Sequence, residues 1–402
     1  MQPINGAPQG VIDPGKVTEA DLVVIQRDFP AHMQAYEKIM ALAHEQSKPV
    51  VVDLDDLLLA LPENHPDRIN HHYSGRLFPL LRALLEADLV TVSTSQLAEH
   101  LNFLDPNIRV LPNYIDEQVW DLSPRQGPAL PDQPIKIAFM GGDSHAPDFE
   151  PLIPVLIEIL QTYPNQVILQ SVGMQLLSPL KDTPNAKAVS FLFDYPGYVD
   201  YVQGQHFDLA IAPLEDNTFN RCKSPMKYLE YSALGVPGVY SNLTPYSGFI
   251  KHGENGFLAS SPQEWRQAIL ALVENPLLRW QMGIAAQETV RQDWLLGNHA
   301  QEWLEAYQFA TCQVGRGRQD AALSLPLFAD LTRQNRLWEE ELEARLQQKE
   351  QETGLLNQKL LEKEQYIAAL SSQIASRRSG LLGRINRGVR WISARFNARM
   401  GH

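Results

Sequence analysis

The chemistry in this sequence is concentrated between residues 219 and 242, where one short stretch carries Lys223, Lys227 and Glu230. Apolar residues recur there at a spacing of three to four, which predicts a helix that begins near Ser224 as its N-cap. Residues three or four apart share a helix face, and cations beside a helix N-terminus favour a phosphorylated ligand. The same pattern also fits a solvated face of paired charges.

A second polar segment follows the apolar run IKIAFM and contains Gly141, Gly142, His145 and Asp148. Two glycines between a strand and a helix allow the backbone to approach a ligand closely. His145 could hydrogen-bond a phosphate or a sugar hydroxyl, or it could have a structural role in the turn. We expect Asp148 to cap the following helix.

Three carboxylates, Asp53, Asp55 and Asp56, follow the apolar run PVVV. At a strand end they could orient sugar hydroxyls, act as a base or bind a divalent metal. Helix capping and turn formation are the alternative for Asp55.

Apolar runs alternate with helical periodicity from residue 21 to 113 and again from 135 to about 310. Near-continuous apolar runs indicate strands buried on both faces, and the alternation predicts parallel, doubly wound sheets. We therefore expect an α/β chain with two Rossmann-like domains, in which ligands bind at the carboxyl ends of the strands. The predicted boundaries are 1–115 for the first domain, 116–134 for a linker and 135–311 for the second domain.

The composition changes after residue 311, where a linker (312–330) precedes a predicted long helix or coiled coil (331–376). One heptad register from 342 to 374 predicts self-association, while a single helix packed on the body is the alternative. The a and d sites hold Leu342, Leu346, Leu356, Leu360, Ile367, Leu370 and Ile374, interrupted by Lys349, Thr353 and Lys363.

The last segment, 377–402, combines seven arginines with apolar residues at helical spacing. A basic amphipathic helix of this kind is suited to the surface of an anionic membrane. An RNA-binding tail and a disordered basic end are the alternatives. The segment's seven positive charges leave −20 on the rest of a chain whose net charge is −13, which argues against general nucleic-acid binding.

The composition is that of an ordinary soluble globular protein. Cys222 and Cys312 are too few and too far apart to indicate a disulfide framework or a cysteine metal site. The N-terminal residues do not resemble a signal peptide, and no apolar run is long enough to span a bilayer. We expect a cytoplasmic protein held at the inner face of the cell membrane.

The stretch LAIAPLEDNTFNRCKSPMKYLEYSALGVPGVYSN (209–242) resembles the donor-binding segment of the group 1 glycosyltransferases with the GT-B architecture. GGDSHAPDFEPL, VVVDLDDLL, ADLVTVST and VLPNYID are also similar to segments of this family. The nearer resemblance is to bacterial members for O-antigen and other surface-polysaccharide synthesis. It runs from about 20 to 310 and is strongest between 207 and 259.

The resemblance implies a nucleotide-sugar donor on the second domain, no other cofactor and no metal, and a retaining reaction. Glu230 matches the second glutamate of the family's E-x7-E signature, which holds the donor ribose, whereas Cys222 stands at the first. Instead of that first glutamate, the segment offers Asn220, Lys223 and Lys227. We expect the two lysines to neutralise the negative charge that builds on the leaving diphosphate. Gly141 and Gly142 would admit the phosphates, with His145 on the donor side.

Compared with the family, the N-terminal domain is shortened, and we expect Asp53, Asp55 and Asp56 on its acceptor side. The leading hypothesis is a glycosyltransferase that acts on a cell-surface glycan or a lipid-linked acceptor. Its alternative is an inactive donor-binding module that recruits partners to a polysaccharide assembly. A sugar epimerase of the same architecture is a weaker third reading, because no histidine–carboxylate set supports it.

Overall fold

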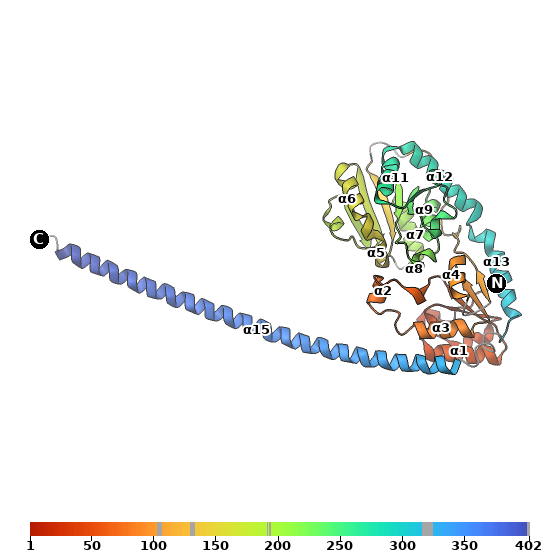
Figure 1. Cartoon of the computed structure of the whole chain (residues 1–402), viewed down its shortest axis with the longest axis horizontal. Helices are drawn as coiled ribbons and strands as arrows, with labels where there is room; N and C mark the ends of the chain where they lie inside the picture. The colour runs from red at the N-terminus through yellow and green to blue at the C-terminus, as the bar shows by residue number, and fades with distance from the viewer. Residues whose placement is uncertain (103–106, 129–132, 191, 193, 316–324, 400–402) are drawn as a thin grey trace. The chain divides into compact units, whose positions relative to one another are not determined.

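The structure, a computed structural model, describes residues 1–402 except 103–106, 129–132, 191, 193, 316–324 and 400–402. It separates into two units, residues 1–332 and residues 333–402. The first unit contains two α/β lobes, shown in Figure 1 with the first lobe in red to orange and the second in yellow to teal.

The first lobe is built on a four-stranded parallel sheet whose strands follow one another in chain order. Val50, Val51 and Val52 are buried on both faces of the sheet, which explains the unbroken apolar run in the sequence. The strands are β1 (Val23–Gln26), β2 (Val50–Leu54), β3 (Leu89–Val92) and β4 (Ile108–Val110).

Helices cover the two faces of this first sheet in different ways. The helices between its strands pack on one face, in a core that includes Val52 and Val90. The opposite face, with Val51 and Leu89, is covered by α13 (Leu296–Thr311), which returns from the far end of the unit. Because the strand order never reverses, the second layer comes from this returning helix, whereas the sequence predicted winding on both sides. The other helices are α1 (Met33–Glu45), α2 (Pro66–Ile69), α3 (Leu77–Glu86) and α4 (Ser95–Leu101).

The second lobe is a six-stranded parallel sheet in the order β10-β9-β8-β5-β6-β7. The chain starts in the middle at β5, builds one half outward and then returns to build the other half. The switch point therefore lies between β5 and β8, and ligands bind at such points in open α/β sheets. The strands are β5 (Ile135–Gly141), β6 (Val167–Gly173), β7 (Ala186–Ser190), β8 (Leu209–Ala212), β9 (Gly238–Ser241) and β10 (Phe257–Ala259).

Both faces of the second sheet carry helices, as the sequence predicted. One core holds side chains of α6 and α11, and the other holds side chains of α7, α9 and α12. The helices are α5 (Ala146–Phe149), α6 (Ile153–Thr162), α7 (Tyr195–Gly204), α8 (Thr218–Arg221), α9 (Met226–Ala233), α10 (Thr244–Ser247), α11 (Pro262–Glu274) and α12 (Pro276–Asp293). Short 3-10 helices lie at Pro8–Gly10, Pro14–Glu19, Phe29–Ala31, Leu58–Ala60, Asp143–His145, Glu150–Leu152 and Leu180–Asp182.

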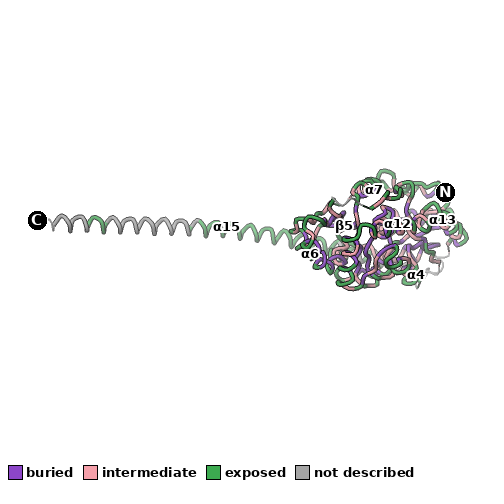
Figure 2. Tube along the Cα trace, turned by 90° about the horizontal axis from the view of Figure 1, so that it is seen from above, coloured by how far each residue is buried: buried purple, intermediate pink, exposed green. Residues whose placement is uncertain are grey.

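One helix, α15 (Leu325–Arg399), provides the described residues of the second unit and begins shortly before it, at Leu325. It runs through both the predicted coiled coil and the predicted basic tail without a break. Every described side chain from 333 to 370 is exposed, as the green trace in Figure 2 shows. The side chains at 371–387 and 392–402 lie outside the described part, and so do Ile374 and most of the tail arginines. Within the described residues, no helix combines the length and the hydrophobicity that crossing a membrane requires.

Candidate functional site

The two lysines of the stretch 219–242 lie at the carboxyl edge of the second sheet, next to its switch point. Helix α9 begins at Met226, and its N-cap is Pro225. Ser224 makes no capping bond, so its prediction as the N-cap is wrong, and the helix starts one residue later than that cap implies. Lys223 consequently precedes the helix, while Lys227 lies in its first turn, where the backbone N–H groups are free of intrahelical partners.

A chain of hydrogen bonds connects Lys227 to a buried carboxylate through His145. The Nζ of Lys227 lies 2.8 Å from Nε2 of His145, and Nδ1 of His145 lies 2.8 Å from Oδ2 of Asp148. Burial and the charges of Lys227 and Lys223 lower the pKa of His145 to about 3. The imidazole is therefore neutral, and it accepts from the ammonium group and donates from Nδ1–H to the carboxylate.

Asp148 is the anion around which this part of the lobe is built. Its Oδ1 accepts from the backbone N–H of Glu215 at 2.9 Å and from Nδ2 of Asn220 at 2.6 Å. Burial opposes its ionisation, but the bond from His145 and the charge of Lys223 outweigh that and lower the pKa to about 2. Asp148 therefore joins three segments rather than capping one helix. Asn220, predicted as a donor ligand, is buried, and its Nδ2 donates to Asp148 and to the carbonyl oxygen of Glu215 in the loop after β8.

Two largely buried lysines, Lys223 and Lys227, lie close to the Asp148 carboxylate. Burial lowers the pKa of Lys227 to about 8, and the nearby charge of Lys223 adds to the effect. Burial also lowers the pKa of Lys223, whose Nζ lies 3.9 Å from Oδ2 of Asp148. Asp148 and Asp56 oppose this lowering for both lysines, and Glu230 does so for Lys227, so two desolvated cations lie among these carboxylates at this edge of the sheet.

Gly141 allows the close approach of these groups. A Cβ added there would lie 3.1 Å from Cδ2 of His145 and 3.2 Å from Cε of Lys227, tighter than ordinary packing. Gly141 also lines a pocket of about 320 Å³ together with Lys227 and Glu230. Gly142 is not among the residues that line this pocket.

Glu230 faces the same pocket from the middle of α9. Its Oε2 accepts from the hydroxyl of Tyr198 on α7 at 3.0 Å. Burial raises its pKa to about 7, against the bond from Tyr198 and the charge of Lys227. A polar ligand that donates hydroxyl groups would restore the hydrogen bonds that burial has removed from this carboxyl group.

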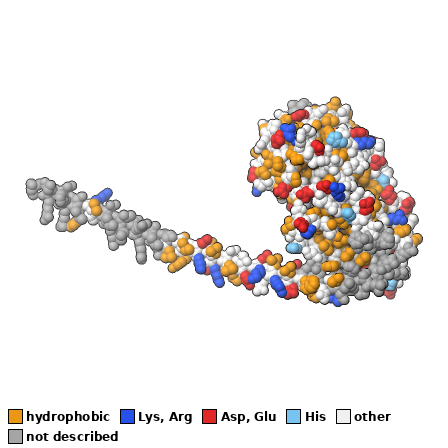
Figure 3. All heavy atoms as spheres, viewed as in Figure 1, with side chains coloured by type: hydrophobic (Ala, Val, Ile, Leu, Met, Phe, Trp, Pro, Cys, Tyr) orange, Lys and Arg blue, Asp and Glu red, His pale blue; other side chains and the backbone are white. Residues whose placement is uncertain are grey.

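A second cavity, of about 290 Å³, lies between the lobes and brings the lysines opposite the first-lobe carboxylates. Asp55 and Asp56 line it, and both accept from Nη1 of Arg27, at 3.1 and 3.0 Å. Figure 3 shows charged side chains of both signs and histidine along the hollow between the lobes. Asp53 does not line this cavity, since its Oδ1 accepts from Thr91 on the neighbouring strand at 2.6 Å.

Cys222, which stands where the first signature glutamate was expected, belongs to the contact between the lobes. Its side chain and that of Phe219 are buried in the core cluster of the first lobe. The carbonyl oxygen of Cys222 accepts from the hydroxyl of Thr94 at 2.8 Å, and burial raises the pKa of its thiol to about 11. Cys222 is not among the residues that line the cavity with the lysines.

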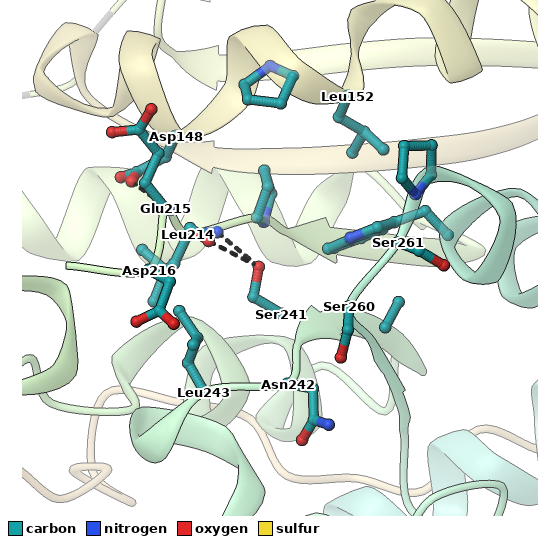
Figure 4. A pocket seen from close by; sticks show the side chains of 15 residues that line it. Asp148, Leu152, Leu214, Glu215, Asp216, Ser241, Asn242, Leu243, Ser260 and Ser261 are labelled. Carbon is teal, nitrogen blue, oxygen red and sulfur yellow. Dashed lines mark hydrogen bonds between the residues drawn. The ribbon is translucent and has the colours of Figure 1, made fainter.

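A third pocket, of about 330 Å³, opens at the carboxyl ends of β8, β9 and β10 (Figure 4). Its polar groups are largely used within the protein, because the Ser241 hydroxyl bonds both the N–H and the carbonyl of Leu214, as the dashed lines show. Ser261 caps α11, and Asp216 pairs with Arg221. Neither lysine is among its lining residues, so the two other cavities are the candidate site.

Sequence reasoning missed two residues of this site. Tyr198 lies 32 positions before Glu230, and no local pattern connects them. Arg27 had a signal, because it ends an apolar run just as Asp55 does, and parallel strands end at the same edge of a sheet. Within the described residues, no group of three or more His, Cys, Asp and Glu side chains is arranged to hold a metal ion.

In comparison with known protein families, one family model matches part of the chain. Residues 137–275, which contain the lysines, His145 and Glu230, match the family model "Glycosyl transferases group 1". At the level of full sequence, no curated protein matches the chain significantly.

Solved structures share the fold at low identity. HepE from Anabaena, in complex with UDP and glucose, has a TM-score of 0.52 and 20% identity over 76% of this chain and 84% of its own. A glycosyltransferase from Rickettsia africae has a TM-score of 0.50 and 13% identity over 77% and 84%. A variant of TarM from S. aureus has a TM-score of 0.51 and 16% identity over 71% of this chain and only 55% of its own. The two lobes therefore form a GT-B fold, and the second lobe carries the match to the group 1 glycosyltransferases.

Proposed function

We propose that this chain is a glycosyltransferase that moves a sugar from a nucleoside diphosphate sugar to a glycan acceptor. The observation that carries the proposal is the chain Lys227–His145–Asp148 beside Gly141. It provides an oriented cation at the sheet's switch point, inside the segment that matches the group 1 family model. HepE was solved with UDP and glucose, and the TarM variant with UDP and a GlcNAc-glycerol. Both structures therefore hold a nucleoside diphosphate together with a sugar or a glycoside.

The donor would span the two cavities that meet at Lys227. The ribose hydroxyls donate to Glu230 in the pocket at Gly141, and the diphosphate lies against Lys227 and Lys223. Backbone N–H groups in the first turn of α9 add to the attraction for anions. The sugar then extends into the cavity between the lobes, toward Asp55 and Asp56.

The chemical role of the lysines is electrostatic. When the bond between the sugar C1 and the phosphate oxygen breaks, negative charge builds on the leaving diphosphate. Lys227 and Lys223 neutralise that charge from positions that burial has already desolvated, so the reaction proceeds without a metal ion. We infer a retaining outcome from the family resemblance.

The acceptor would enter from the first lobe, where Asp55 and Asp56 bind its hydroxyl groups and Arg27 holds the two carboxylates in place. Burial and the neighbouring charge of Asp56 raise the pKa of Asp55, as suits a group that accepts a proton from an acceptor hydroxyl. We propose a surface glycan of the O-antigen type or a lipid-linked glycan as the acceptor. Asp53, turned to Thr91, has no part in this binding.

The basic segment 377–402 would hold the enzyme at the cytoplasmic face of the membrane, close to a lipid-linked acceptor. Deletion of 377–402 should abolish co-sedimentation with vesicles that contain phosphatidylglycerol, while phosphatidylcholine vesicles should not bind the full chain. Equal sedimentation of the deleted and full chains would refute this role.

The activity is tested by nucleotide release from UDP, GDP, dTDP and CMP sugars, after a thermal-shift screen identifies the donor that binds. Lys227→Met should lower release by about 10² to 10³, the usual loss for one group that stabilises transition-state charge. Lys251→Met is the matched control, because Lys251 is exposed and pairs only with Glu254 among the described contacts. If the wild type releases nucleotide from no donor, the enzyme proposal fails.

The alternative, an inactive donor-binding module, predicts a thermal shift with a nucleotide sugar but no release. One feature of the sequence favours it, the absence of a carboxylate at 222. Because Cys222 faces the first-lobe core, its identity does not diminish the charge beside Asp148. Lys223, Lys227 and Glu230 all line the candidate cavities.

A further inference from the structure

We propose that α15 associates with the α15 of a second copy of this chain as a parallel, in-register, two-stranded coiled coil. This inference concerns assembly, and it does not rest on the proposed activity. It uses the described side chains from 333 to 370.

The first observation is an apolar stripe on a helix whose surface is exposed. Five side chains of the stripe are between 57% and 65% exposed: Leu342, Leu346, Leu356, Leu360 and Ile367. Figure 3 shows orange hydrophobic side chains between red and blue ones along this part of α15. A helix gains most of its stability in water by packing an apolar face, so a stripe of this kind requires a partner.

The spacing of the stripe determines the geometry of the partner. Its members all fall on a and d sites that follow one another at alternating steps of four and three residues, the 3.5-residue repeat that produces a left-handed supercoil. Six of the nine a and d layers between 342 and 370 are apolar. Leu346, Leu360 and Ile367 occupy a positions, while Leu342, Leu356 and Leu370 occupy d positions.

The flanking charges select the orientation. In a parallel dimer each g residue faces the e residue five positions later in the partner helix. This rule pairs Arg345 with Glu350 of the second copy and Lys359 with Glu364 of the second copy. Glu352 faces Asn357, so none of these three contacts brings like charges together.

An antiparallel pair would lack this complementarity. There e positions face e positions, and this register has glutamate at three of its e sites, 343, 350 and 364. Repulsion between carboxylates therefore disfavours the antiparallel arrangement.

The three polar layers favour two strands over three. Lys349 and Lys363 occupy d sites, and Thr353 occupies an a site. A lysine at the edge of a two-stranded core can extend its ammonium group into water, whereas a three-stranded core encloses it more fully. Lys349 already reaches outward to Glu352, with its Nζ 2.8 Å from Oε2.

The mass of the full chain is the first test. Sedimentation equilibrium should give twice the chain mass of 45.3 kDa at micromolar concentration. A monomer or a trimer at that concentration would overturn the proposal.

Two adjacent leucines provide a matched pair of variants. Leu356 and Leu355 are 65% and 61% exposed, yet only Leu356 lies in the stripe. Leu356→Asp should weaken the dimer at least about tenfold, because it buries a charge in the seam, and Leu355→Asp should leave the dimer intact. Equal effects of the two variants would show that the register is wrong.

Cysteine cross-linking tests orientation in the full chain with the exposed Cys312 changed to serine. Leu346→Cys and Ile367→Cys should each form a disulfide with the same residue of the second copy, and Gln351→Cys, on the outer face, should not. Positions 346 and 367 are about 31 Å apart along a helix, so an antiparallel pair cannot join each to itself in one register. A disulfide between 346 and 367 would refute the parallel arrangement.

Charge exchange tests the pairing directly. Arg345→Glu should weaken the dimer, since it places two carboxylates together, and adding Glu350→Arg should restore it. If the double variant is as weak as the single one, these residues do not face each other.

Discussion

Cys222→Glu, the substitution that would complete the E-x7-E signature, should destabilise the protein instead of improving its activity. The Cys222 side chain is 1% exposed and packs with Phe219 in the core of the first lobe. A glutamate there would bring a carboxylate and extra volume into an apolar environment. The signature alone predicts the opposite result, a gain in donor binding.

The size of the effect follows from the environment of the thiol. Burial raises the pKa of Cys222 from 9.0 to about 11, and two pKa units correspond to about 3 kcal/mol against a negative charge. The larger side chain adds about 1–3 kcal/mol of overpacking. We therefore expect a loss of between about 4 and 6 kcal/mol in the free energy of unfolding.

Urea unfolding followed by circular dichroism measures this loss. The midpoint of the transition that reports the first lobe should fall by more than about 1 M. Cys312→Glu is the matched control, because it places the same charge at an exposed cysteine and should change stability by no more than about 0.5 kcal/mol. A Cys222→Glu protein with wild-type stability and faster nucleotide release would refute the reasoning, because position 222 would then face the donor.

Three further predictions concern the buried charges. Lys227 must be protonated to neutralise charge, and its pKa is about 8, so nucleotide release should fall as the pH rises through 8. Lys227→Arg should retain activity at pH 9. A wild-type rate that stays constant up to pH 10 would contradict this prediction. In steady-state assays, His145→Ala should lower kcat about 10- to 100-fold with little change in KM, because Lys227 loses the partner that orients it. His145→Asn keeps a hydrogen-bond acceptor and should recover part of this loss. The folded-state pKa of Asp148, about 2, is below its ordinary value of 3.8, so its ionised form stabilises the protein fully above pH 4 and progressively less toward pH 2. The urea midpoints of wild type and Asp148→Asn should therefore differ most near neutral pH and converge below pH 3, and a constant difference would contradict the assignment.

Much of the architecture could be predicted from sequence, because strands and helices leave local periodic signals. The apolar run around Val51 predicts a buried strand, and the helical spacing of apolar residues in α9 and α15 predicts helices, each from residues that lie close together in the chain. The Gly141–Gly142 turn and the lysines also follow from local pattern, since parallel strands must end at one edge of the sheet.

Tertiary structure decided which of these side chains meet. Asp148 accepts from His145, three positions away, and from Asn220, 72 positions away, and periodicity carries no information about the second contact. Alternation along β2 would place Asp53 and Asp55, two residues apart, on the same side. Only the tertiary structure shows that Asp53 accepts from Thr91 on the neighbouring strand, whereas Asp55, beyond the end of β2, accepts from Arg27.

The sequence by itself determined the α/β alternation, the charged residues at the strand ends and the heptad stripe of α15. Only the tertiary structure decided that α13 closes the first sheet and that Cys222 faces the other lobe. The physical reason is that burial of one side chain against another depends on the order of strands and the packing of lobes, which involve residues distant in the chain.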